Sequence, residues 1–382
     1  MKDQVISSFI KNFLDTPLVV FAPGRINLIG EHTDYQEGFV FPAAITQGIW
    51  VGIKKNNLGS LCRLYSLDFD QEFSFDLHHL SPKKGHWATY IMGICAQLKQ
   101  SGYPVEGFDL ALGGNTPIGA GLSSSAAISI ATALAISEAF HFQVPKKNLV
   151  VYAQKSEHLF AGVNCGIMDP YACAFGKAQH ALLLDCRSQT HQEIPVEFPG
   201  YALLLTHSKV SHSLADSAYN ARRAACEESM FLLKDLFPSA HTLRDLSCKQ
   251  LEVIQEVLPK TLYPKAKHVI SECTRVHEAA DALRAGNVKG FGDMLYASHQ
   301  SLSKDFEVSC AELDYLVEQA RVHGSVLGSR MMGGGFGGCT LSLVRQEALE
   351  DICAHLEKMY TKKFQLVPDF IRVEIGSGAS QV

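Results

Sequence analysis

The chain of 382 residues lacks any apolar run long enough to span a bilayer, and it has no basic stripe and no polybasic tail. Its 34 lysine and arginine residues are scattered, and 39 acidic residues leave a net charge of −5. We therefore expect neither a membrane nor a nucleic acid as a partner. The remaining composition, with 47% hydrophobic and 19% charged residues, is typical of a globular protein, and the length allows two domains with sizeable cores.

The signatures of a disulfide framework and of a zinc site are also missing. The 11 cysteines are odd in number, form no CxxC pair and do not cluster. This usage favours buried free thiols in a reducing compartment. The first residues have helical spacing but neither a long apolar core nor a small-residue cleavage site, so no signal peptide is predicted. We expect a cytoplasmic protein.

No internal repeat, low-complexity segment or flexible linker interrupts the chain. Helical spacing predicts helices over residues 3–15, 86–100, 123–140 and 147–161 and a mostly helical stretch over 213–323. Short apolar runs predict strands over residues 18–21, 39–53, 107–112, 181–185 and 201–205. Because helices and strands mix without regular alternation, we expect an α+β fold. The polar, proline-containing stretch 187–200 indicates a boundary between domains 1–190 and 191–382.

The segment of residues 24–35 reads GRINLIGEHTDY and has an unusual mixture of polar groups. The carboxylates of Glu31 and Asp34 accept hydrogen bonds, His32 can donate or accept, and Arg25 supplies a rigid fork of donors. A small polyhydroxylated ligand requires such a mixture, because each hydroxyl group needs a donor and an acceptor at a fixed angle. The segment therefore predicts a binding site for that kind of ligand.

Residues 114–127 read GNTPIGAGLSSSAA, so glycines precede a serine run that opens an apolar helix. Glycines allow successive backbone N–H groups to point at one spot, the helix dipole adds positive charge, and serine hydroxyls can bond phosphate oxygens or a metal. The pattern suits a polyphosphate, with a serine-capped helix after a tight turn as the structural alternative. It is not a P-loop, because no Gly-Lys-Ser/Thr follows the glycines.

Asp169 follows an apolar pair and a glycine in the run of residues 165–169. Burial would disfavour the charged carboxylate, whereas an adjacent arginine would keep it ionised, and Arg25 is the candidate partner. An ionised aspartate beside a sugar hydroxyl can accept its proton while the oxygen attacks phosphorus. In the alternative interpretation Asp169 caps the next helix, with Pro170 in the first turn.

Two further segments have more than one interpretation. In residues 207–223 two histidines suggest a metal, but no third ligand stands at a suitable spacing. The glycine-rich run 328–340 fits a dinucleotide GxGxxG pattern poorly, because it is expected between two strands instead of between a strand and a helix. A flexible hairpin tip is the structural alternative there.

Together these segments resemble the galactokinase family of the GHMP small-molecule kinases. The resemblance is carried by GRINLIGEHTDY at 24–35, PIGAGLSSSA at 117–126, CGIMD at 165–169, HSLADSAYNARR at 212–223 and the glycine run at 328–340. A WxxYxxG helix that starts at Trp87 also matches the family. The resemblance covers the chain from about residue 18 onwards. It implies two domains with the active site between them.

The resemblance implies ATP-dependent phosphorylation of the anomeric hydroxyl of α-D-galactose, the first step of the Leloir pathway, with ATP as co-substrate and Mg²⁺ as metal. It implies Arg25 and Asp169 as catalytic residues and Ser125 and Glu157 as metal ligands. The residues implied in sugar binding are Glu31, His32, Asp34, Gly166, Asp169 and Tyr219. The residues implied in ATP binding are Trp87, Gly119, Ala120, Gly121, Leu122, Ser123, Ser124, Ser125 and Ala126.

The chain departs from the family pattern at two positions. Pro170 stands where the family usually has glutamine, and Tyr171 stands where it usually has phenylalanine. Because proline removes a backbone donor and fixes φ, the orientation of Asp169 is open, as is its role as a true base or an orienting group. We expect these two departures to affect the rate and the substrate range more than the type of reaction.

Two alternatives remain at this point. One is a kinase for N-acetylgalactosamine or arabinose, since one sequence does not show the space around the C2 and C6 groups of the sugar. The other is a non-catalytic galactose and ATP sensor, against which the intact serine run at 123–126 argues. We expect a monomer and leave a dimer open.

Overall fold

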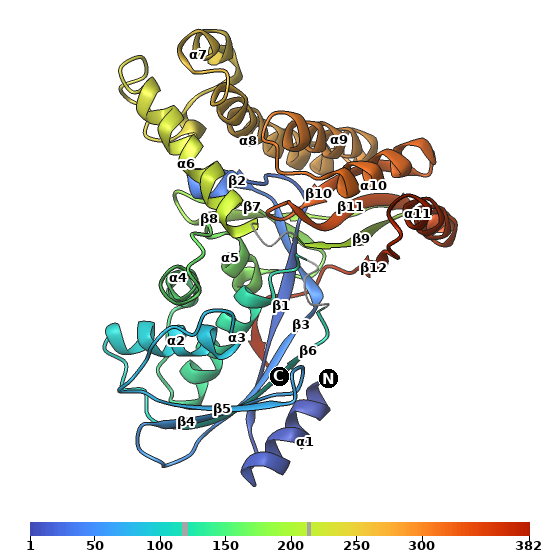
Figure 1. Ribbon diagram of the computed structural model, residues 1–382. Helices are drawn as coiled ribbons and strands as arrows, with labels where there is room; N and C mark the ends of the chain where they lie inside the picture. The colour runs from blue at the N-terminus through green and yellow to red at the C-terminus, as the bar shows by residue number, and fades with distance from the viewer. Residues whose placement is uncertain (117–120, 212–214) are drawn as a thin grey trace.

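A computed structural model describes residues 1–116, 121–211 and 215–382. It has two lobes, the first built on a six-stranded sheet and the second on a four-stranded sheet (Figure 1). The helices are α1 (Lys2–Phe13), α2 (Ala88–Gln100), α3 (Ser124–Ala139), α4 (Lys146–Ser156), α5 (Met168–Phe175), α6 (Ala215–Leu233), α7 (Leu251–Val257), α8 (Tyr263–Arg284), α9 (Val288–Lys304), α10 (Ala311–Val322) and α11 (Leu349–Phe364). The strands are β1 (Leu18–Asn27), β2 (Phe39–Val40), β3 (Pro42–Lys55), β4 (Leu61–Ser66), β5 (Gln71–Asp76), β6 (Phe108–Gly114), β7 (His180–Asp185), β8 (Thr190–Pro195), β9 (Tyr201–Ser211), β10 (Val326–Met332), β11 (Gly337–Arg345), β12 (Asp369–Val373) and β13 (Ser380–Gln381). Short helical turns are η1 (Asp34–Gln36), η2 (Glu157–Ala161), η3 (Leu243–Asp245), η4 (Cys248–Gln250) and η5 (Gln346–Ala348).

The first lobe is a helix-covered sheet with strand order β13-β1-β3-β6-β4-β5, in which only β4 and β6 run parallel. Helices α2, α3, α4 and α5 lie on one face of this sheet, while α1 lies on the other (Figure 1). Helix α3 is apolar around most of its circumference, which fits its position between the sheet and the other helices. The large apolar core of this lobe therefore fixes α3 and the serine run at its start.

The second lobe contains an antiparallel sheet with strand order β10-β11-β9-β12. Helices α9 and α10 pack against β10, and α8 packs against α9 (Figure 1). The strands β10 and β11 are joined by the tight glycine turn of residues 333–336, as the sequence predicts. This turn points back toward the first lobe.

A third sheet, with order β2-β7-β8, lies at the junction and contacts α8. The chain then returns from the second lobe to the first, because β13 pairs with β1. The tail before β13 is also held there, since Gly376 N donates to Ala44 O at 2.9 Å and Gly378 N donates to Gly176 O at 2.7 Å. The two lobes are thus joined at two points along the chain.

The architecture confirms the α+β prediction, and the predicted helices and strands are found, although β1 and β9 extend six residues beyond the strands predicted over 18–21 and 201–205. The strands β4 and β5 were not predicted. Two further features were also missed. The polar stretch 187–200 contains β8, an edge strand with one neighbour and only Ile194 fully buried. The helix predicted over 147–161 ends as an α-helix at Ser156 and continues as the π-helical turn η2, a distortion that is frequent at functional sites.

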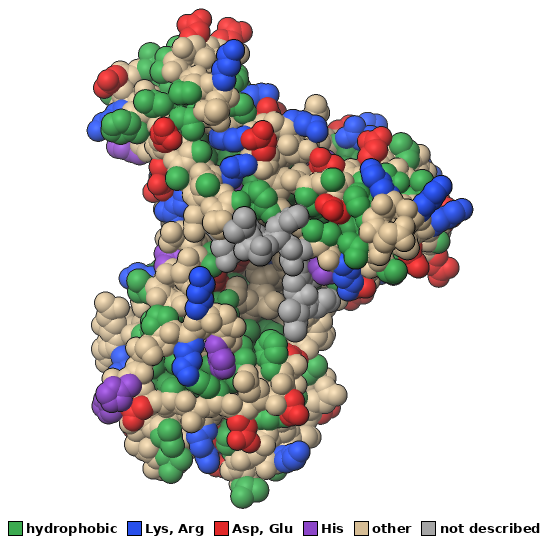
Figure 2. All heavy atoms as spheres, in the orientation of Figure 1, with side chains coloured by type: hydrophobic (Ala, Val, Ile, Leu, Met, Phe, Trp, Pro, Cys, Tyr) green, Lys and Arg blue, Asp and Glu red, His purple; other side chains and the backbone are tan. Residues whose placement is uncertain are grey.

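On the face shown in Figure 2, acidic and basic side chains are interspersed on both lobes. No helix of the described part of the chain has both the length and the apolar character needed to cross a membrane.

Candidate active site

Two adjoining cavities lie where the lobes meet. The small cavity has a volume of about 170 Å³ and the large cavity a volume of about 740 Å³. The small cavity is lined by Arg25, Glu31, His32, Asp34, Glu157, Val163, Cys165, Gly166, Met168, Asp169, Tyr219, Gly333 and Gly334. Four of these residues also line the large cavity, namely Arg25, Val163, Gly333 and Gly334. A ligand in one cavity therefore shares a wall with a ligand in the other.

The 28–33 loop, which follows β1, forms one wall of the small cavity. It carries Glu31, whose buried carboxylate accepts hydrogen bonds from Arg330 Nη2 at 2.7 Å, Gly333 N at 2.8 Å and Asn27 Nδ2 at 2.8 Å. A carboxylate has about four acceptor positions, so about one remains for a ligand hydroxyl. Glu31 thus makes hydrogen bonds within the protein and also lines the small cavity.

His32 is held in the left-handed region with a φ of 62°. Its Nε2 lies 3.2 Å from the carbonyl oxygen of Gly334, and its Nδ1 lies 2.9 Å from the hydroxyl of Tyr35. Because a carbonyl only accepts, Nε2 carries the proton and Nδ1 accepts from Tyr35. Burial, together with the nearby His268, lowers the pKa of His32 to about 3, so the ring is neutral near pH 7. The ring of Tyr219 from α6 packs on it with a centroid distance of 5.2 Å.

Asp34 links the start of η1 to the start of α5. Its carboxylate accepts a hydrogen bond from Tyr35 N at 2.9 Å and another from the backbone of Met168, the first residue of α5. Burial, and then the negative charge of Asp169, raises the pKa of Asp34 to about 7. A Cβ atom on Gly166 would lie only 1.8 Å from Asp34 Oδ2, so the carboxyl group occupies the space that glycine leaves free.

The predicted pair of Arg25 and Asp169 is present at the boundary of the cavities. Arg25 Nε donates to Asp169 Oδ1 at 2.7 Å and Arg25 Nη2 donates to Asp169 Oδ2 at 2.5 Å, which is the bidentate geometry of a strong ion pair. Arg25 Nη1 also donates to the carbonyl of Gly121 at 2.5 Å. The alternative in which Asp169 caps α5 is wrong, because the residue at the N-cap is Ile167 and Asp169 lies in the first turn.

The serine run contacts two acidic side chains. Ser123 occupies the N-cap position of α3 with a φ of 57°, and its hydroxyl donates to Asp169 instead of capping the helix. Ser125 makes a side-chain hydrogen bond to Glu157, the first residue of η2. Burial, and then the charge of Asp169, raises the pKa of Glu157 to about 7. The positive charge of Arg25 opposes this shift without overcoming it.

The hydroxyl of Ser125 and the carboxylate of Glu157 fit Mg²⁺, which takes oxygen ligands and is bound in kinases by one or two protein groups together with phosphate oxygens and water. In the described ranges, no group of three or more His, Cys, Asp or Glu side chains could hold a metal ion. The described residues therefore supply few ligands of their own. Of the two histidines in 207–223, His212 lies outside the described residues.

The large cavity combines polar loop residues with aromatic walls. Gly121, Leu122 and the serines at 123–125 line it, as does Trp87, whose Nε1 donates to Gln71 Oε1 at 2.8 Å. Ala126 is fully buried beneath the serine run and lines neither cavity. Gly119 and Ala120, which are predicted to bind ATP, lie outside the described residues. Lining residues that the sequence analysis did not single out are Ile49, Asp68, Phe69, Lys84, Gly85, His86, Thr89, Thr116, Ile128, Ala161 and Val163.

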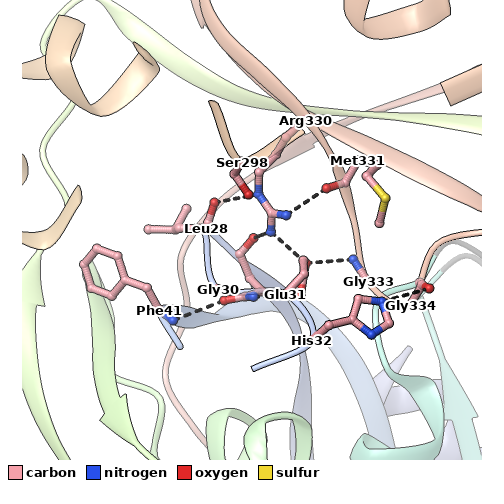
Figure 3. Close-up of polar contacts among 12 residues, drawn as sticks. Leu28, Gly30, Glu31, His32, Phe41, Ser298, Arg330, Met331, Gly333 and Gly334 are labelled. Carbon is pink, nitrogen blue, oxygen red and sulfur yellow. Dashed lines mark hydrogen bonds and ion pairs between the residues drawn. The ribbon is translucent and has the colours of Figure 1, made fainter. Parts of the chain in front are cut away.

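Sequence reasoning also missed a set of buried polar residues behind the 28–33 loop (Figure 3). Arg330 on β10 has no exposed surface and bonds Glu31. Glu272 and His268 on α8 are equally buried and bond the backbone of the same loop. Because these contacts join residues more than 230 positions apart, spacing could not reveal them; the one available signal was an arginine inside the apolar strand 326–332.

Comparison with known protein families finds three matching stretches. Residues 7–55 match the galactokinase galactose-binding signature, residues 89–177 match the N-terminal domain of GHMP kinases, and residues 279–362 match the C-terminal domain of GHMP kinases. The first stretch contains the 28–33 loop, the second contains the serine run and Asp169, and the third contains Arg330 and the glycine turn.

Individual relatives agree with these matches. The chain is 40% identical to a galactokinase of Bacillus subtilis over 368 residues, which covers 95% of this chain and 94% of the relative. It is 39% identical to a galactokinase of Thermotoga maritima over 363 residues, or 95% and 99% of the two chains. Among solved structures, Lactococcus lactis galactokinase complexed with galactose superposes with a TM-score of 0.96 at 35% identity, over 100% of this chain and 99% of that one. A mevalonate kinase of Methanococcus jannaschii, at 18% identity and a TM-score of 0.66, shares the fold.

Proposed function

The chain belongs to the galactokinase family of the GHMP kinases, and from this premise we propose that it transfers the terminal phosphoryl group of ATP to the anomeric hydroxyl of α-D-galactose. The observation that carries the proposal is the shared wall of the two cavities, where the Arg25–Asp169 pair faces both a polar pocket and the serine run. The solved relative with 35% identity holds galactose, which supports a hexose in the small cavity. ATP, the co-substrate of this kinase family, then belongs in the large cavity.

In the proposed reaction, the C1 oxygen of the sugar attacks the terminal phosphorus, the bond from that phosphorus to the ADP oxygen breaks, and the hydroxyl proton goes to Asp169. Asp169 already accepts two hydrogen bonds from Arg25 and one from Ser123, so about one acceptor position is left for the sugar hydroxyl. This restricts the direction from which the hydroxyl can approach. Arg25 stabilises the negative charge that develops on the transferred group.

The other sugar contacts follow from the walls of the small cavity. We assign hydroxyl recognition to the carboxylates of Glu31 and Asp34, the backbone of Gly166 and the hydroxyl of Tyr219. Both ring nitrogens of His32 are engaged by the protein, so we assign its contribution to shape and packing. A site that hydrogen-bonds hydroxyls at fixed positions discriminates strongly against sugars that lack them.

We assign Mg²⁺ to Ser125 and Glu157. When bound, the ion would neutralise phosphate charge and orient the terminal phosphoryl group. Glu157 would then be ionised, because a cation at its carboxylate favours the charged form.

A coupled assay of ADP release tests the proposed function. Galactose, N-acetylgalactosamine and arabinose are compared at equal concentration with Mg-ATP, and phosphorus NMR of the product identifies the phosphorylated carbon. We expect galactose to be the preferred substrate and the product to carry phosphate at C1. Nucleotide binding without turnover of any of the three sugars would refute the kinase assignment, and preference for another sugar would refute the assignment of the substrate.

Three further assignments are kept as proposals. The division into domains 1–190 and 191–382 places the boundary at the first residue of β8. All 11 cysteines are free thiols, which supports a reducing compartment such as the cytoplasm. We also propose that the protein is a monomer, which light scattering at several protein concentrations tests.

A further inference from the structure

The 28–33 loop is held from behind by side chains of the second lobe. Glu272 Oε1 accepts a hydrogen bond from Gly30 N at 3.0 Å, and His268 Nε2 lies 3.1 Å from Glu31 O. Arg330 Nε donates to Leu28 O at 2.8 Å. Each of these three side chains has no exposed surface. These residues, which reach neither cavity, therefore add to the bonds that the loop makes with residues 39–41 in fixing its conformation.

Arg330 makes the largest share of these contacts (Figure 3). Besides Leu28, its guanidinium donates to Met331 O at 2.8 Å, to Asn27 O at 2.7 Å and to Glu31 Oε1 at 2.7 Å. At least four of its five N–H groups are thus used. It contacts both strands that flank the junction, because Asn27 ends β1 and Met331 lies in β10.

The effect of Arg330 reaches the cavities through Glu31. The same Oε1 atom that accepts from Arg330 also accepts from Gly333 N at 2.8 Å, at the start of the glycine turn that lines both cavities. A second bond ties this turn to the loop, from His32 Nε2 to Gly334 O at 3.2 Å. The loop and the turn consequently form one unit whose geometry depends on where the Glu31 carboxylate is held.

Arginine is the side chain suited to this position. Its planar fork can serve three carbonyl groups and a carboxylate at the same time, whereas lysine offers a compact charge with three donors on a flexible stem. The pair is also deeply buried, with Glu31 2% exposed, so water cannot replace a missing donor. Removal of the guanidinium would leave the Glu31 carboxylate with two of its three protein donors, Gly333 N and Asn27 Nδ2, so its position would be less firmly fixed.

We propose that Arg330 is a positioning residue for the sugar: it fixes the Glu31 carboxylate and the backbone of the 28–33 loop, so that the unoccupied acceptor position of Glu31 faces the small cavity. This inference rests on the proposed function and adds to it a residue that lines neither cavity. It places the control of sugar affinity partly in the second lobe.

The Arg330→Lys variant tests this inference in the full-length protein. We expect the KM for galactose to rise at least about tenfold and kcat/KM for galactose to fall by up to about a hundredfold, the scale of a misplaced binding group. The KM for ATP should change less than about threefold. Arg63→Lys is the matched control, because Arg63 makes a bidentate pair with buried Asp109 in the first lobe, away from both cavities. The control should lower the melting temperature and leave both KM values unchanged.

A lower melting temperature with unchanged galactose kinetics in Arg330→Lys would overturn the inference, since Arg330 would then be structural only. If Arg330→Lys does not fold, the double variant Glu31→Gln with Arg330→Met decides, because it removes both buried charges together. We expect its KM for galactose to stay within about threefold of that of Glu31→Gln alone, because the contact of Arg330 that reaches the cavity runs through Glu31 while its bonds to Leu28 O and Asn27 O act on the backbone. A KM at least about tenfold above that of Glu31→Gln would overturn the inference.

The wild-type protein is measured alongside these variants. If the wild-type protein phosphorylates a different sugar of the panel, the substrate assignment is wrong. The inference on Arg330 is then tested by the KM for that sugar in place of the KM for galactose. If it phosphorylates none, calorimetric binding of galactose replaces KM: weaker binding by Arg330→Lys than by Arg63→Lys supports the inference, and equal binding overturns it.

Discussion

Replacement of Gly166 by alanine should damage the site through Asp34. A Cβ atom at position 166 would meet Asp34 Oδ2 at 1.8 Å, Cγ at 2.1 Å and Oδ1 at 2.7 Å, all too close to be tolerated. The carboxyl group must therefore rotate away or the start of α5 must move. In the first case Asp34 loses its hydrogen bonds from Tyr35 N and from the backbone of Met168.

The cost can be worked out from those two bonds. A buried polar group that loses its hydrogen-bond partner costs about 1 to 3 kcal/mol. We therefore expect Gly166→Ala to lower the free energy of unfolding by about 3 kcal/mol. Because Asp34 and the first turn of α5 both line the small cavity, the KM for galactose should rise at least about tenfold.

The assay combines urea unfolding, followed by circular dichroism, with ADP-release kinetics. The decisive comparison is Gly166→Ala in an Asp34→Ala background, where no carboxyl group occupies the space. There we expect the second substitution to cost less than about 0.5 kcal/mol, so that the two effects are strongly non-additive. Gly113→Ala is the control, because its nearest neighbours lie at 3.2 Å and are side-chain atoms. An equal cost of Gly166→Ala in both backgrounds would refute the reasoning.

Three other predictions concern charges and aromatic contacts of the same cavities. Asp169→Ala should abolish ADP release while nucleotide binding, measured by calorimetry, stays within about threefold of the wild type; substantial residual turnover would contradict a catalytic role. The folded-state pKa of Asp34 lies above its ordinary value of 3.8, so ionisation of Asp34 lowers the stability of the folded protein as the pH rises from about 4 to about 7. In Asp34→Asn the melting temperature should therefore fall less over this range than it does in the wild type. Parallel curves of melting temperature against pH for the two proteins would contradict the assignment. Trp87→Phe removes the indole donor that holds Gln71 and part of the wall of the large cavity, and it should raise the KM for ATP by about threefold to tenfold without a change in the KM for galactose.

Local chemistry predicted much of the site. Gly121 and the serines at 123–125, and the acidic residues of 24–35, lie on the walls of adjoining cavities. The ion pair of Arg25 and Asp169 was predicted from the needs of a half-buried carboxylate, and the structure contains it. The glycine–serine run could be located because it depends on neighbouring residues, whereas the pairing of Arg25 with Asp169, 144 positions away, rests on the charge that a half-buried carboxylate requires.

Other features depend on distant parts of the chain. Arg330 and Glu31 are 299 positions apart, and no spacing rule relates a buried arginine in one strand to a carboxylate in a remote loop. The strand β8 was missed because an edge strand with one buried residue has the composition of a turn. The π-helical turn that carries Glu157 was missed because its backbone register is set by packing and not by a residue pattern.

Gly166 shows a third reason why sequence reasoning falls short. Its motif pointed to the sugar, but the structure shows that glycine is needed there because a neighbouring side chain, Asp34, fills the space. Which atom occupies the volume beside a glycine is a property of the assembled fold. The glycine at position 166 could thus be assigned to the site from the sequence, but the reason why only glycine fits there is visible only in the packing of the folded chain.

The return of β13 to β1 has a consequence for how this protein comes apart. A protease that cut the exposed segment between β8 and β9 would produce two fragments that stay associated. The reason is that β13, at the end of the carboxyl-terminal fragment, pairs with β1 in the sheet of the amino-terminal fragment. Such a nicked molecule should elute as one particle from a sizing column and separate only in denaturant. An independently expressed fragment of residues 1–190 would lack its outer edge strand and leave the amide groups of β1 open to self-association.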